Sequence, residues 1–263
     1  PDVRVNTVSA ASTHMLRARA RQLVRDMPAM AAAIDRIEQF TVGNGICLQG
    51  RIKDHKGKLD QKANTRIEDA WKRWCDEADV AGRLHFYEIQ QLCCRSEVEV
   101  GEYCVVKTTA PRHNRLMPFC LAVLEPDQLA GSGATPLPDN DIHQGVEYQI
   151  STGRAVAYHF EIPQLNPSTK YVRVPAKDVI LGFRTLRPGQ LRGVTPLAPV
   201  LLLAHQLRDY LEAEIATAQK AARWLAFVTS QDPAATMEAL GAFASPIVDT
   251  STPEKYTMDM GHA

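Results

Sequence analysis

The segment R-P-G-Q-L-R-G, at residues 187–193, holds the side chains best suited to specific polar chemistry in this chain. Arg187 and Arg192 carry planar guanidinium groups, which donate paired hydrogen bonds to carboxylates or phosphates. Gly189 and Gly193 permit tight backbone turns. We expect a strand-to-helix loop in which the arginines pair with acids of the same or a neighbouring subunit. The candidate residues of this motif loop are Arg187, Pro188, Gly189, Gln190, Arg192 and Gly193.

Motifs that bind nucleotides or metals, or that hold a catalytic nucleophile, are missing. Gly131-Ser132-Gly133 does not begin a phosphate-binding loop, because two prolines soon after it forbid the helix that would hold the phosphate. Asp139-Asn140-Asp141 is interpreted as an Asx-rich turn in preference to a cation site. The sequence therefore predicts a protein that is not an enzyme, with no catalytic residue, cofactor or metal. A less favoured alternative is a small-molecule enzyme with a pocket of His159, Asp178 and Arg187.

Composition and charge narrow the possible functions. The chain has 263 residues, 45% of them apolar, which suits one large domain or two small ones. Its 30 basic and 30 acidic residues give no net charge, so no overall field attracts nucleic acid. No signal peptide is evident, and the longest apolar run, 197–204, is far shorter than a membrane span. We expect a protein made in a reducing cytoplasm, with six free cysteines that pack as small apolar side chains.

The first helix is expected over residues 13–42, with Thr13 as its cap and a break at Pro28, which suits the first turn of a new helix. Four arginines precede the first acid of this helix: Arg17, Arg19, Arg21 and Arg25. We favour a solvated helix face for them. The alternative is a DNA-binding protein whose Arg17–Arg25 helix contacts phosphates, with an affinity that falls steeply with salt.

Two more helices are expected before the chain turns to strands. One begins near Asn64, where Thr65 and Glu68 fit a capping box. The other covers about 86–98, and Gly101 ends it.

The middle of the chain alternates in the manner of strands. A hairpin that turns at 151–153 is expected within it, and residues 126–144 are expected to form a loop. The expected strands cover residues 102–109, 119–125, 145–150, 154–162, 171–174 and 179–183. The fold class is therefore α+β, with N-terminal helices, a body built on a mixed, mostly antiparallel sheet, and a long helix after it.

That long helix is expected over residues 196–228, with Thr195 as its cap. Apolar residues recur every three or four positions, and they become alanines in the second half. At 1.5 Å per residue it is roughly 45 Å long. Alone it would expose too much apolar surface, so we expect copies of the chain to pack beside one another.

Several segments occur in a specific order and spacing: R-A-R-A-R-Q-L-V-R-D-M-P at 17–28, V-G-N-G-I-C-L-Q at 42–49, W-x-x-W at 71–74, L-E-P-D-Q-L at 124–129, G-R-A-V-A-Y-H at 153–159, R-V-P-A-K-D-V-I at 173–180 and R-P-G-Q-L-R-G-V at 187–194. Together they resemble the portal proteins of lambda-type tailed phages over nearly the whole chain. Those proteins are longer, and their second stem helix and crown have no counterpart here. The resemblance therefore implies a C-terminally truncated chain.

The resemblance also implies an organisation and a function. Residues 1–195 would form the wing and body, 196–228 the stem helix and 229–263 the start of the clip. The protein would form a homo-oligomeric ring, typically a dodecamer, at a capsid vertex of the virion, after assembly in the bacterial cytoplasm and without contact with a membrane. Double-stranded DNA would pass through the ring during packaging and ejection. Its protein partners would be the terminase, the capsid and scaffold proteins and the head-to-tail adaptor.

Charged residues of the implied stem helix are candidates for contacts with DNA in the channel or between subunits. Three basic and three acidic residues balance there, which suits pairing between subunits and weak contact with DNA. The candidates are Arg208, Lys220, Arg223, Glu212 and Glu214.

Overall fold

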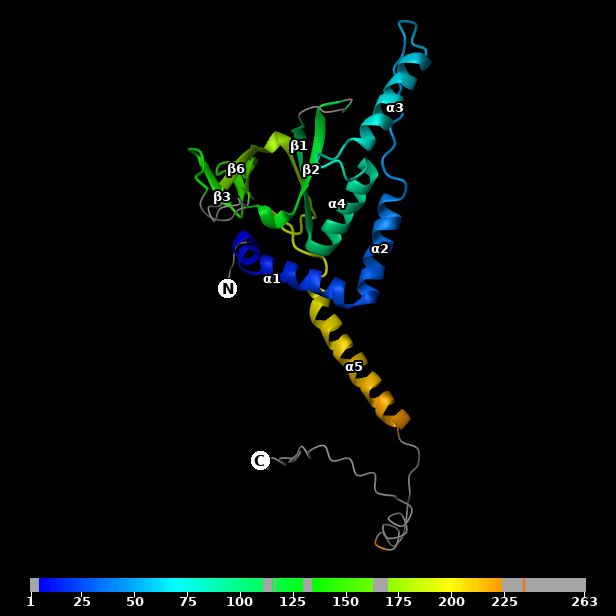
Figure 1. The fold of residues 1–263 in the computed structure, drawn as a ribbon. Helices are drawn as coiled ribbons and strands as arrows, with labels where there is room; N and C mark the ends of the chain where they lie inside the picture. The colour runs from blue at the N-terminus through cyan, green and yellow to red at the C-terminus, as the bar shows by residue number, and fades with distance from the viewer. Residues whose placement is uncertain are drawn as a thin grey trace. The chain divides into compact units, whose positions relative to one another are not determined.

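A computed structural model describes residues 5–110, 115, 117–129, 134–162, 170–223 and 234 of the chain. It shows an α+β protein, as expected, with antiparallel sheets and a long helix after them (Figure 1). The chain divides into two compact units, residues 1–210 and 211–263. The helices are α1 (Val5–Asp26), α2 (Pro28–Val42), α3 (Gln61–Asp76), α4 (Phe86–Val100) and α5 (Leu201–Arg223).

The break in the first expected helix is confirmed, because Pro28 is the first residue of α2. The expected cap at Thr13 is wrong: α1 begins at Val5, and Thr13 is buried within it. Residues 6–12 contain no glycine or proline that would stop a helix, so α1 extends over them.

The start of α3 also differs from the expectation. Asp60 caps this helix by accepting a hydrogen bond from the Ala63 N–H at 3.0 Å, so the expected box of Thr65 and Glu68 is wrong. Glu68 instead accepts the Gly50 N–H at 2.9 Å.

The capping box lies at α4, where the N–H of His85 donates to Glu88 at 2.7 Å and the His85 ring accepts from Tyr87 at 3.1 Å. Gly101 ends α4 with a left-handed φ of 94°, as expected.

The strands form two antiparallel sheets instead of the single one expected. One has the order β2-β1-β7 and the other β3-β4-β5-β6. The first contains β1 (Glu102–Thr109), β2 (Phe119–Leu124) and β7 (Val179–Phe183); the second contains β3 (Asn140–His143), β4 (Val146–Gln149), β5 (Ala155–Ile162) and β6 (Lys170–Pro175).

Strand β3 lies inside the expected loop 126–144, so that prediction is wrong there. Asn140 and Asp141 belong to this edge strand, whereas Asp139 turns the chain with a φ of 66°. Asn and Asp are uncommon in strands, and only pairing with β4 makes this segment extended.

Three apolar clusters form the core, and all lie within residues 1–210. The first joins α3 and α4 to β1 and β2, and the second lies between the two sheets. In the third, Ala20, Val24 and Ile34 of α1 and α2 enclose Leu197, which precedes α5. The third cluster therefore attaches the beginning of the long helix to the N-terminal helices.

Glu147 of β4 is a fully buried carboxylate in the four-stranded sheet. It accepts hydrogen bonds from Arg173 Nε at 2.7 Å and from Asn140 at 2.6 Å, and its Oε2 lies 2.9 Å from the His159 ring. The hydrogen bond from Arg173 is the largest cause that lowers the pKa of Glu147, and together with the other partners it outweighs burial, which raises the pKa; the result is a shift from 4.5 to about 2.

Because the pKa is lowered on folding, Glu147 stabilises the protein above its unfolded-state pKa, and this contribution is lost between about pH 4.5 and pH 2. We expect the free energy of unfolding to fall less steeply with acid in Glu147→Gln than in wild type. Urea unfolding at several pH values measures this. Glu125→Gln, at an exposed residue, should keep the wild-type slope. Equal slopes in all three proteins would contradict the prediction.

Candidate functional site

The motif loop connects β7 to the turn Ala198–Val200 that leads into α5, so the expected strand-to-helix loop is confirmed. Its residues separate into two groups. Arg187, Pro188 and Gly189 are exposed, whereas Gln190, Arg192 and Gly193 are buried. In the described part of the chain Arg187 has no ion pair.

Gln190 closes the loop on itself. Its side-chain oxygen accepts the N–H groups of Leu186 at 2.9 Å and of Arg187 at 3.3 Å, and its Nε2 donates to the Arg192 carbonyl at 2.7 Å. A buried amide with all these partners stabilises one loop conformation.

Asn6 of α1 attaches the loop to the N-terminal helix. Its Nδ2 donates to the Gly189 carbonyl at 3.0 Å, and its Oδ1 accepts the Leu191 N–H at 3.2 Å. The sequence analysis did not identify Asn6, because it lies more than 180 residues from its partners and in no recognisable motif.

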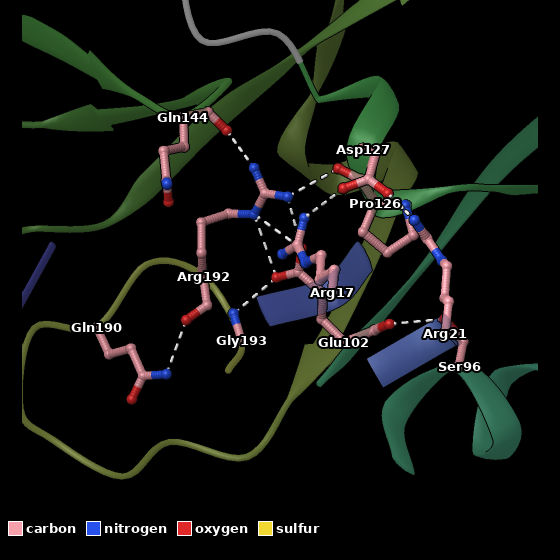
Figure 2. A network of polar contacts seen from close by, with 10 residues as sticks. All are labelled: Arg17, Arg21, Ser96, Glu102, Pro126, Asp127, Gln144, Gln190, Arg192 and Gly193. Atoms are coloured by element: carbon pink, nitrogen blue, oxygen red, sulfur yellow. Dashed lines mark hydrogen bonds and ion pairs between the residues drawn. The ribbon is translucent and has the colours of Figure 1, made fainter. Parts of the chain in front are cut away.

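Glu102, the first residue of β1, lies at the centre of the site and is completely buried (Figure 2). Arg192 donates from Nε at 3.0 Å and from Nη2 at 2.5 Å to Oε1, and Arg17 of α1 donates to the same oxygen. The Gly193 N–H donates to Oε2 at 2.6 Å. The carboxylate therefore joins β1, α1 and the motif loop.

Arg192 has two further acceptors, the carbonyl of Gln144 and the carbonyl of Pro126 at 2.7 Å. The expectation that a loop arginine pairs with an acid is confirmed for Arg192, whose partner Glu102 belongs to the same chain. A charged residue at the start of an apolar strand was the available signal for Glu102.

The arginines of α1 are not a simple solvated face. Arg17 is buried and pairs with Glu102 and Asp127, and Arg21 pairs with Asp127 at 2.5 Å. Burial raises the pKa of the Asp127 carboxyl, but the hydrogen bonds from Arg17 and Arg21 outweigh it and leave the pKa below its ordinary value. Arg19 and Arg25 remain exposed. The solvated-face prediction is therefore wrong for Arg17, and a DNA-binding α1 would have few arginines to offer.

Thr195, which follows the motif loop, is hydrogen-bonded to the last turn of α4. Thr195 donates its hydroxyl hydrogen to the Glu99 carbonyl at 2.8 Å and accepts the Leu197 N–H at 3.1 Å. The expected helix cap at Thr195 is wrong, because the turn Ala198–Val200 follows Leu197 and α5 begins at Leu201 instead of residue 196.

The charged candidates of α5 lie mostly in solvent. Lys220, Glu212 and Glu214 are exposed, and the Arg208 guanidinium lies 2.9 Å from the His205 ring and 3.3 Å from Asp209. The Arg223 side chain and the expected helix end at 224–228 lie outside the described residues, as does the segment 229–263 apart from Ala234.

The pocket required by the enzyme alternative does not assemble around its three residues. His159 is buried against Glu147, Arg187 is exposed, and no hydrogen bond or ion pair joins His159, Asp178 and Arg187 among the described residues. No group of His, Cys, Asp and Glu side chains within that part of the chain is arranged to hold a metal ion. None of the described helices combines the length and the apolar character of a membrane span.

Both carboxylate oxygens of Glu102 accept hydrogen bonds inside the protein, whereas Arg17 Nε and Gln144 Oε1 are buried without a hydrogen-bond partner in the described part of the chain. The site is therefore a polar joint between α1, β1 and the motif loop, which we call the Glu102 joint. It holds the segment that leads into α5.

Known proteins that resemble this chain match most of its length. The model of the family "Phage portal protein, lambda family" matches residues 2–262. A protein of Halomonas phage phiHAP-1 with the name "Probable portal protein" is 28% identical over 204 residues, which cover 73% of this chain and 38% of the relative. The chain thus spans less than half the length of that relative.

Proposed function

Because the chain belongs to the lambda family of phage portal proteins, we propose that it forms part of a ring-shaped channel for double-stranded DNA at a capsid vertex. The family match over residues 2–262 carries this proposal. The α+β fold with its long helix is consistent with a portal. The role is structural: the protein positions other components and catalyses no reaction.

The exposed apolar face of α5 supports assembly into a ring. Leu203, Leu211 and Ile215, which are spaced by multiples of four residues and so lie on one side of α5, are 63%, 46% and 57% exposed. Large apolar side chains that gather on one surface mark places where proteins associate. Side-by-side packing of α5 from neighbouring copies, up to a dodecamer, would bury them.

We assign residues 1–195 to the wing and body, 196–228 to the stem helix and 229–263 to the start of the clip. In this assignment the Glu102 joint holds the wing and body to the beginning of the stem. Arg208, Lys220, Arg223, Glu212 and Glu214 then make contacts between subunits or weak contacts with DNA. The ring docks the terminase, the capsid and scaffold proteins and the head-to-tail adaptor in the virion.

Replacing two apolar residues of α5 tests the proposal in the full-length protein. We expect wild type to form closed rings, and Leu211→Lys with Ile215→Lys to reduce the ring fraction about tenfold or more at equal concentration, because each buried apolar side chain contributes about 1.5–3 kcal/mol. Native mass spectrometry and negative-stain microscopy measure this. Gln206→Lys, at an exposed polar residue of α5, is the matched control.

A wild-type protein that stays a compact monomer would contradict the proposal. If that monomer also bound DNA with an affinity that falls steeply with salt, the DNA-binding alternative would be supported instead.

A further inference from the structure

A second surface, on α3, takes no part in the Glu102 joint. An apolar pocket of about 370 Å³ lies between α3, the segment that precedes it and the start of β2. We call it the α3 pocket. Leu48, Ile67, Met117 and Phe119 line it and remain exposed. Such a group of large apolar side chains marks a surface where another molecule binds.

The pocket is formed before any partner arrives. Its wall with Leu48 is attached to α3, since the Gly50 N–H donates to Glu68 at 2.9 Å and the Ile52 N–H donates to Asn64 at 2.8 Å. Asn64 also donates to the Ile52 carbonyl at 3.2 Å. A pocket held in this way needs little ordering when it is filled.

Positive charge predominates in the segment that includes the α3 wall of this pocket. Residues 51–73 contain eight lysines and arginines but four acids, in a chain with no net charge. None of these eight side chains forms an ion pair within the described part of the chain, and all eight are exposed. Figure 1 shows the loop before α3 and the first turns of α3 extending beyond α2 and α4.

Most of the acids in this segment are occupied by backbone groups. Asp54 accepts the N–H groups of residues 56 and 58 at 2.8 and 2.9 Å. Asp60 accepts from Ala63 at 3.0 Å, and Glu68 accepts from Gly50 at 2.9 Å. The carboxylates thus stabilise the loop and the helix start, and the cations are left for a partner.

We propose that this surface binds an acidic protein segment, which inserts a large apolar side chain into the α3 pocket and places its carboxylates near Arg66 and Arg73 of α3. Arg66 and Arg73 are seven residues apart and so share one face of α3. That face borders the apolar one with Ile67 and Trp74. An apolar centre with a charged rim is the usual composition of a protein interface. The proposal does not depend on ring formation.

A nucleic acid fits this surface less well. Bases bind single aromatic rings by stacking on a free face. Here Trp74 stacks on Phe119 with centroids 5.9 Å apart, and Trp71 contacts Trp74 at 5.0 Å and Phe86 at 5.2 Å. Because these rings are packed against one another, they have no free face on which a base could stack. Phosphate groups are charged and would not fill the apolar pocket.

Three fluorescein-labelled synthetic peptides test the proposal with the full-length protein by fluorescence anisotropy. The first has glutamates on both sides of a Leu-Phe pair. The second has serines in place of that pair, and the third has glutamines in place of the glutamates. We expect saturable binding of the first peptide, and we expect the other two peptides to bind at least about tenfold more weakly than the first. Added salt should weaken binding of the first peptide.

Variants of the protein locate the binding surface. Ile67→Glu, and separately Arg66→Glu with Arg73→Glu, should each weaken binding of the first peptide about tenfold or more. Lys177→Glu, at an exposed lysine elsewhere, should bind as wild type. Thermal unfolding checks that each variant is folded, and Ile67→Ser replaces Ile67→Glu if the latter is unstable. The proposal is overturned if the first peptide shows no saturable binding, or if the variants at Ile67 and at Arg66 with Arg73 bind it as wild type does. It is also overturned if a short DNA duplex displaces the peptide and binds with equal or higher affinity.

Discussion

Replacing Glu102 by alanine is expected to lower the free energy of unfolding by about 3–5 kcal/mol. The carboxylate is fully buried and accepts hydrogen bonds from Arg192, Arg17 and the Gly193 N–H. Alanine would leave Arg192 without any ionic partner in a buried place. Since small proteins are stable by only about 5–15 kcal/mol, the loss should be plain in urea unfolding at neutral pH.

Two further variants show whether the effect belongs to the buried charge. Glu125→Ala, at an exposed glutamate, should change the free energy of unfolding by no more than about 0.5 kcal/mol. Glu102→Gln keeps the shape of the side chain and one acceptor oxygen, so its free energy of unfolding should lie between those of Glu102→Ala and wild type. If Glu102→Ala were as harmless as Glu125→Ala, the Glu102 joint would contribute nothing to stability.

Gly101→Ala should cause a loss of about 3 kcal/mol or more. Gly101 has a φ of 94°, in the left-handed region that residues with a Cβ avoid. A Cβ there would also lie 2.3 Å from the backbone carbon of Val194, which cannot move aside like the end of a side chain. Differential scanning calorimetry and urea unfolding of the variant measure the combined effect.

Variants at two other glycines separate the backbone strain from the steric clash of the added Cβ. Gly153 has a φ of 71° and open space around it, so Gly153→Ala should show the backbone strain alone, about 1–2 kcal/mol. At Gly193 a Cβ would lie 2.1 Å from the Gly101 carbonyl oxygen. Gly193→Ala therefore tests the same close contact between the backbone at Gly101 and the motif loop, with the added Cβ on the loop. If Gly101→Ala and Gly153→Ala lost equal stability, the contact between the two backbones would have no energetic importance.

Together these variants address how the motif loop is attached to the body. Arg192 and Gly193 bind Glu102, Thr195 binds the Glu99 carbonyl, and Leu197 packs against α1 and α2 directly afterwards. In our proposal the Glu102 joint keeps the beginning of the stem helix in a defined position in the ring.

The local elements were largely predictable. The break at Pro28, the end of α4 at Gly101 and the strand over 102–109 follow from residue preferences that act over a few positions. The errors occurred where a local signal had a competitor. Thr65 and Glu68 fit a capping box, but Asp60 caps the helix earlier, and Asn140 lies in β3 because β4 pairs with it.

By itself the sequence determined the fold class, most of the helices and strands and membership of the portal family, because residue periodicity and motif spacing are contained in short stretches of chain. Only the tertiary structure decided what the arginines do. Arg17 and Arg192 meet Glu102 across 85 and 90 residues of chain. No local pattern reports such a distance, since which charge is buried, and against which partner, depends on how the chain returns to itself.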